Sequence, residues 1–109
     1  MSFQVALMEP DSAIAATVLR RREGWSTTVA AEPATVEVAY EFGDFFAFEA
    51  LDRKTGRETI DQLRDAVLEL GLRQLQDWTL PSRGNVGVVC AMLLSWACEH
   101  PEAVWQVDR

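Results

Sequence analysis

Hydrophobic and polar residues alternate cleanly between Val36 and Phe42. Successive side chains of a β-strand point to opposite faces, so this pattern predicts a strand that is buried on one side. The apolar face comprises Val36, Val38, Tyr40 and Phe42. Glu37 and Glu41 fall on the opposite face, together with Ala39, and we expect them to meet water.

A second apolar stretch, residues 46–51, follows directly and predicts the other strand of a hairpin whose loop is Gly43–Phe45. In this register every inward-facing pair is apolar. The pairs are Phe42 with Phe46, Tyr40 with Phe48, and Val38 with Ala50. A two-residue loop would instead bring Glu49 onto the core side. We therefore expect Phe45 at an exposed tip, and Glu49 on the outer face with Glu37 and Glu41.

Residues 60–70 have the spacing of an amphipathic helix. Apolar side chains recur every three or four positions at Ile60, Leu63, Ala66, Val67 and Leu70. Thr59 and Gln62 have the spacing of a capping box, in which each side chain accepts a backbone N–H at the start of the helix. We expect Gly71 to end this helix, since glycine is favoured just after the last helical residue.

The stretch from Val86 to Cys98 contains no charged residue and is rich in large apolar side chains. It is too short to span a bilayer, which takes about 20 apolar residues, so it predicts a helix buried within the domain. Ser82 or Asn85 is expected to cap the helix and Pro101 to end it. Small residues at intervals of four predict one side that packs closely on another element: Gly87, Ala91 and Ser95.

Three further elements complete the predicted fold. They are a strand at Phe3–Leu7, a helix capped by Asp11 or Ser12 that runs to about Glu23, and a last strand at residues 103–107. We therefore expect a single α+β domain over residues 1–109. In it, an antiparallel sheet of about four strands packs against two to three helices.

The formal net charge is −7, and it is unevenly distributed along the chain. Consecutive carboxylates with no Lys or Arg between them are Glu32, Glu37, Glu41, Asp44, Glu49 and Asp52. Binding of nucleic acid requires a basic field that neutralises phosphates, so we expect no partner of that kind. The first residues lack the basic start and apolar run of a signal peptide, and we expect a cytoplasmic protein with no membrane segment.

No arrangement of residues predicts catalysis. The single histidine, His100, is near Cys98 in sequence, but Cys98 belongs to an apolar run in which a thiol stays neutral. Cys90 and Cys98 are both expected to be buried, and they are too far apart along a helix for a disulfide. These three residues also lack the short spacings of zinc ligands. We therefore expect no catalytic residue, no metal ligand and no cofactor, and a protein that is not an enzyme.

The carboxylates of the expected hairpin are the residues best suited to a functional role. Like charges gathered on one strand face repel each other, and a basic protein partner would offset that cost. The candidate partner-binding residues are Glu37, Glu41, Asp44, Phe45, Glu49 and Trp78, with the two aromatic residues as apolar anchors. The same glutamates also suit a strand face that only has to stay soluble and to avoid edge pairing.

In size, acidity, α+β organisation and lack of a catalytic motif, the chain resembles the small cytoplasmic immunity proteins that bacteria make against their own secreted toxins. The resemblance implies a stoichiometric inhibitor that binds a co-encoded toxin. We expect that toxin domain to be basic, and the inhibitor to be a monomer or a homodimer. The alternative is a small-ligand-binding or homo-oligomeric domain, whose pocket or interface is built from the apolar hairpin face and the stripe of small residues.

Overall fold

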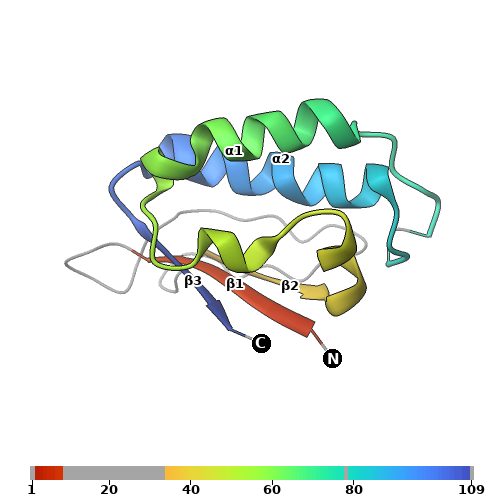
Figure 1. Ribbon diagram of the computed structural model, residues 1–109, viewed down its shortest axis with the longest axis horizontal. Coiled ribbons are helices and arrows are strands. Elements are labelled where there is room, and N and C mark those ends of the chain that lie inside the picture. The colour runs from red at the N-terminus through yellow and green to blue at the C-terminus, as the bar shows by residue number, and fades with distance from the viewer. Residues whose placement is uncertain (1, 9–33, 78, 109) are drawn as a thin grey trace.

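Two α-helices lie side by side over one face of a three-stranded antiparallel sheet in the part of the chain that the computed structural model describes, residues 2–8, 34–77 and 79–108 (Figure 1). In chain order the elements are β1 (Ser2–Met8), β2 (Ala34–Ala39), the 3-10 helices η1 (Tyr40–Asp44) and η2 (Phe48–Leu51), α1 (Gly56–Leu70), α2 (Arg83–Glu99) and β3 (Val104–Asp108). The predicted α+β class is confirmed, with slightly fewer described elements than expected. The helix predicted from residue 11 to about 23 lies outside the described residues.

β1 is the central strand, and the order of the sheet is β2-β1-β3. The register aligns one apolar face across all three strands, because Val5 lies opposite Val36 of β2 and Val107 of β3. The side chains of β1 on that face are buried: Phe3, Val5 and Leu7. The strands predicted near both ends of the chain are therefore confirmed.

The outer edge of β3 is covered by the chain's own backbone. Arg53 N donates to Trp105 O at 2.9 Å, and Trp105 N donates to Lys54 O at 2.8 Å. One residue earlier, the Asp52 carboxylate accepts a hydrogen bond from Val107 N at 3.0 Å. These bonds occupy backbone groups that an exposed strand edge would leave open to another chain.

The predicted hairpin does not form, and this part of the sequence analysis was wrong. β2 ends at Ala39 and pairs with β1, while the following residues form η1 and η2 instead of a second strand. Phe48 and Leu51, three residues apart, both point inward from η2 and are fully buried. A short apolar run satisfies either periodicity, and here the 3-10 spacing of three residues per turn buries the large side chains.

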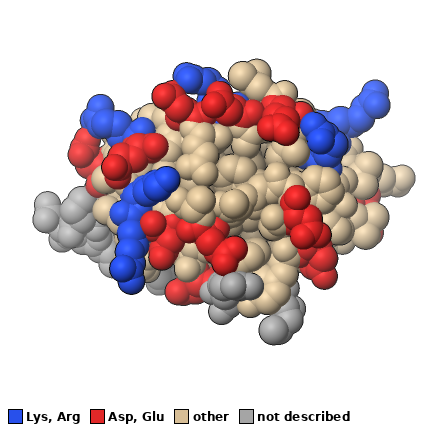
Figure 2. Space-filling view, viewed as in Figure 1, with Lys and Arg blue, Asp and Glu red and all other residues tan. Residues whose placement is uncertain are grey.

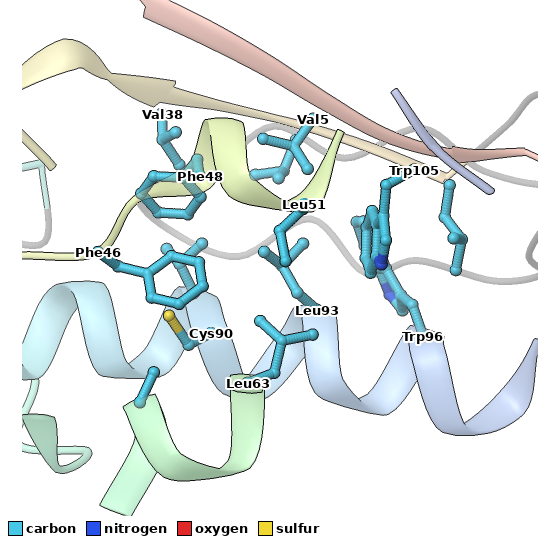
Figure 3. Packing of buried hydrophobic residues seen from close by; sticks show 14 of the residues in the cluster. Val5, Val38, Phe46, Phe48, Leu51, Leu63, Cys90, Leu93, Trp96 and Trp105 are labelled. Carbon is cyan, nitrogen blue, oxygen red and sulfur yellow. The ribbon is translucent and has the colours of Figure 1, made fainter. Parts of the chain in front are cut away.

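The hydrophobic core lies between the sheet and the helices, and the 3-10 segment contributes to it directly. Figure 3 shows Phe46, Phe48 and Leu51 standing between side chains of the sheet and those of the two helices. The rings of Phe46 and Phe48 meet edge to face, with centroids 5.1 Å apart. Phe46 and Phe48, expected on the inner face of a hairpin, are therefore core residues, whereas Ala50, expected on the same face, is exposed and Leu51 is buried in its place.

α1 begins one turn earlier than predicted. Its capping box is Thr55 with Glu58, whereas we expected Thr59 with Gln62. Thr59 is buried, where its hydroxyl accepts from the Trp105 indole at 2.8 Å and donates to Gly56 O at 2.9 Å. The sequence offers the same spacing twice, and burial of the second threonine leaves the first to cap the helix. Gly71 ends α1 as predicted, with φ of +78°.

α2 is the buried helix that the uncharged stretch predicts. Ser82 caps it, since its hydroxyl accepts from Asn85 N at 3.1 Å, and Leu93 on the second half of the helix is fully buried. The expectation for the two thiols is half wrong: Cys90 is buried, but Cys98 is exposed. A helix covered on one side by α1 and on another by the sheet still turns a strip of its surface outward, and Cys98 lies there.

Candidate functional site

The acidic residues of the expected binding surface are exposed, but they do not share one strand face. Glu37 lies on β2, whose neighbouring residues Val36 and Val38 point into the core, so Glu37 faces away from the helices. Glu41 and Asp44 lie on η1, and Glu49 lies on η2. Trp78, the second proposed aromatic anchor, is outside the described residues.

Glu41, Asp44 and Phe45 are the members of this set that the structure brings together. In a 3-10 helix side chains three residues apart lie one above the other, so the exposed carboxylates of Glu41 and Asp44 line one side of η1. Phe42 points the other way and is buried. Phe45 follows at the end of η1 and keeps 37% of its surface exposed. This turn therefore presents two carboxylates beside a partly exposed aromatic ring.

Glu37 and Glu49, expected to gather on one face of a hairpin, lie on different elements, β2 and η2. Across the sheet, Glu37 lies opposite the uncharged Gln4. Glu49 is exposed on η2, where its neighbours Phe48 and Leu51 are buried. Residues 37–49 nevertheless contain a run of exposed carboxylates with no Lys or Arg among them. We call residues 37–49 the acidic segment.

A second exposed surface was missed by the sequence analysis. Four leucines at the end of α1 and in the loop that follows it are exposed: Leu68 by 76%, Leu72 by 56%, Leu75 by 43% and Leu80 by 48%. We call these four residues the leucine surface. One signal was present in the sequence, because Leu68 stands among the charged positions of α1 and outside its apolar stripe.

The buried side chain of Asn85 holds the loop of the leucine surface in place. Its carbonyl oxygen accepts from Leu75 N at 2.9 Å, and its amide nitrogen donates to Leu80 O at 2.7 Å and to Asp77 O at 3.2 Å. Near the tip of the loop the Thr79 hydroxyl donates to the Asp77 carboxylate at 2.6 Å, which with the Thr79 N–H lowers the pKa of Asp77. The loop is therefore built on α2 through hydrogen bonds.

Two glycines at the start of α2 bring the same loop against the helix backbone. A Cβ atom at Gly84 would stand 1.7 Å from the carbonyl oxygen of Arg73, and one at Gly87 would stand 1.7 Å from that of Gly71. Only glycine leaves room for this contact. The predicted stripe of small residues therefore packs against the chain itself at Gly87, whereas Ser95, at its other end, is exposed.

Candidate groups for chemistry are few among the described residues. Burial raises the pKa of the Cys90 thiol to about 12, so this thiol stays protonated and unreactive. Over residues 2–8, 34–77 and 79–108 no group of three or more His, Cys, Asp or Glu side chains is arranged to hold a metal ion. In that same part of the chain no helix has the length and apolar character needed to cross a membrane.

Comparison with known proteins identifies no family: no protein-family model, curated protein or solved structure matches this chain. Its function must therefore be inferred from the acidic segment and the leucine surface.

Proposed function

We propose that this protein is a stoichiometric inhibitor, an immunity protein of bacterial type, that binds and neutralises a co-encoded basic toxin domain. In this proposal it acts in the cytoplasm and has no catalytic activity of its own. The observation that carries it is the turn of η1, where exposed Glu41 and Asp44 stand beside the partly exposed Phe45.

The physical support comes from charge and from an apolar anchor. A molecule of net charge −7 attracts a basic partner from a distance, and the exposed carboxylates of Glu41 and Asp44 add local negative charge at η1. Charge alone gives speed of encounter more than affinity, because exposed ion pairs contribute little. A partly exposed aromatic side chain such as Phe45 is the kind of residue that dominates binding energy when it enters a pocket.

The test is co-expression with the product of the neighbouring gene, followed by measurement of toxicity, complex formation and affinity. We expect the neighbour to arrest growth when expressed alone and to be neutralised in a one-to-one complex. Glu41→Lys with Asp44→Lys should then weaken binding at least tenfold, because both attractive charges become repulsive. Glu99→Lys with Glu102→Lys, at the end of α2, makes the same change of charge away from both the acidic segment and the leucine surface and serves as the control.

Further variants separate the parts of the proposed site. Phe45→Ala should speed dissociation with little effect on the association rate, whereas the charge reversals should slow association most at low salt. Glu37→Lys and Glu49→Lys show whether the partner also reaches β2 and η2. Equal affinity of the wild type, the Glu41 and Asp44 double variant and Phe45→Ala would remove the acidic segment as the binding site.

A small-ligand-binding or homo-oligomeric domain remains the second candidate function. The surfaces first expected to support it, the apolar hairpin face and the stripe of small residues, no longer do so. The apolar hairpin face is core, with Phe48 fully buried, and Gly87 is covered by the chain's own backbone at Gly71. The expected hairpin face and the Gly87 end of the stripe are therefore not open to a ligand or a second subunit. The specific observation in favour of the oligomeric form is the leucine surface.

A further inference from the structure

The four leucines of the leucine surface lie near one end of the helical layer, where the loop after α1 meets the start of α2. Leu75 and Leu80 are joined to the same Asn85 side chain through their backbones. Leu72 lies between two residues, Gly71 and Arg73, whose carbonyl groups contact the first turns of α2. Leu68 is one turn back along α1. Figure 2 shows uncharged residues at the right end of the molecule, with Lys or Arg above them and Asp or Glu below them in this view.

Four large apolar side chains at the end of α1 and in the following loop remain exposed. Scattered exposed leucines are common, but a contiguous apolar area of some hundreds of Å² on a monomer often marks an interaction site. The exposed fractions of 76% at Leu68 and 56% at Leu72 place whole side chains in water. Covering them would remove apolar surface from water at about 25 cal/mol per Å².

The charges around the leucine surface differ in kind from those of the acidic segment. Exposed carboxylates and guanidinium groups alternate along α1 and into the following loop: Asp61, Arg64, Asp65, Glu69, Arg73 and Arg83. Figure 2 shows the same mixture of red and blue along the upper edge, over α1. With the exposed Asp77 of the same loop, three positive and four negative side chains surround the leucine surface, so both signs of charge are present there, whereas the acidic segment contains no positive residue.

We propose that the leucine surface is the interface of a homodimer, in which a second copy of this chain packs on it about a two-fold axis. A surface that meets its own copy must be self-complementary, which requires apolar residues at the centre and both signs of charge at the rim. The leucine surface meets both conditions. The three arginines of the rim make it a less favourable site for a strongly basic partner than the acidic segment.

In the proposed dimer the two-fold axis passes near Leu68 perpendicular to α1, so the two α1 helices are antiparallel. The residues before Leu68 in one molecule then lie near the residues after Leu68 in the other, which brings Asp65 of each copy toward Arg73 of the other copy. Leu72, Leu75 and Leu80 of the two loops flank the crossing. About 800 Å² per molecule is usual for a stable interface, so these leucines supply its centre and the charged rim supplies the rest.

The experiment measures association of the purified full-length protein by sedimentation equilibrium over a range of concentrations. We expect the wild type to form a dimer that dissociates on dilution. Leu68→Lys should raise the dimer dissociation constant at least tenfold, because it places two ammonium groups at the axis. Ala50→Lys, an exposed site on η2, makes the same change of net charge and should leave that constant unchanged.

A charge exchange tests the antiparallel arrangement. Asp65→Arg and Arg73→Asp should each weaken the dimer, and the double variant should restore most of the lost affinity. Leu68 and Asp65 are exposed, so these substitutions should leave the far-UV circular dichroism and the urea midpoint of the monomer unchanged.

Two outcomes would overturn the proposal. One is a wild type that stays monomeric at the highest soluble concentration. The other is a dimer that Leu68→Lys does not weaken relative to Ala50→Lys. If the wild type stays monomeric but Leu68→Lys weakens the complex with the neighbouring gene product, the leucine surface binds that partner and not a copy. Loss of the dimer leaves the proposed inhibitor function unaffected, because that function is tested at Glu41 and Asp44.

Discussion

Gly87→Ala tests the closest contact in the fold, the crossing of the loop after α1 over the first turns of α2. A Cβ atom at position 87 would stand 1.7 Å from Gly71 O and 2.9 Å from the carbonyl carbon of Gly71. Ordinary contact begins at 3.4 Å, so the loop has to move by more than an ångström. The added Cβ atom would clash with backbone atoms of Gly71, and no side-chain rotation can relieve that clash.

Two opposing effects set the magnitude. Alanine is favoured over glycine inside a helix by about 1 kcal/mol. Overpacking of a well-packed site costs about 1–3 kcal/mol and occasionally more, and a backbone clash belongs at the upper end of that range. Movement of Gly71 would also disturb its hydrogen bond to Val67 O, 2.8 Å long, at the end of α1. We therefore expect Gly87→Ala to lower the free energy of unfolding by about 2 kcal/mol.

The assay is urea denaturation followed by tryptophan fluorescence and by circular dichroism. With an m value of about 2 kcal/mol per M, typical of small domains, the midpoint should fall by about 1 M at unchanged m. Gly43→Ala is the matched control, because a Cβ there meets only the ring of Phe3, at 3.4 Å. Its midpoint should stay close to that of the wild type. A midpoint for Gly87→Ala equal to or above the wild type would show that the crossing is not tight and that helix propensity dominates.

Two further predictions concern titratable groups. The Thr55 backbone N–H and hydroxyl donate hydrogen bonds to the Glu58 carboxylate and lower the pKa of Glu58. The ionised carboxylate therefore stabilises the folded protein fully above its unfolded pKa near 4.5. This stabilisation disappears as the pH falls through the lower pKa of the folded state. The difference in urea midpoint between the wild type and Glu58→Gln should thus shrink from pH 7 to pH 3, and a constant difference would contradict the capping box. In the folded protein Cys98 should react with a disulfide reagent, while Cys90 should react only after unfolding. If the folded Cys98→Ser variant still reacts with the reagent, Cys90 is accessible and the prediction is wrong.

The sequence by itself determined the elements whose signals are local. The uncharged stretch ending at Cys98 forms α2, capped by Ser82, because no other arrangement removes so much apolar surface from water. The apolar stripe of residues 60–70 lies on α1, and Gly71 ends that helix because it adopts a backbone conformation that glycine alone enters readily. The short strands near the two ends of the chain were also predicted from their alternation.

Tertiary structure decided the choices for which the local signals were equal. The pattern of residues 36–42 fitted a strand, but its partner is β1, far away in sequence, and no local rule distinguishes that partner from the next apolar run. Once β1 pairs with β2, the run that includes Phe48 is free to fold into η2 and fill the core. Likewise Thr55 caps α1 because the distant Trp105 buries Thr59 against itself.

The candidate surfaces follow the same division. That Glu41, Asp44 and Phe45 are exposed could be predicted from their place beside an alternating apolar pattern. The sequence pattern could not predict that Glu37 lies on a different face from η1, or that four leucines remain exposed to water. Exposure of an apolar side chain depends on which neighbours the packing brings against it, and the packing of α1 leaves Leu68 76% exposed.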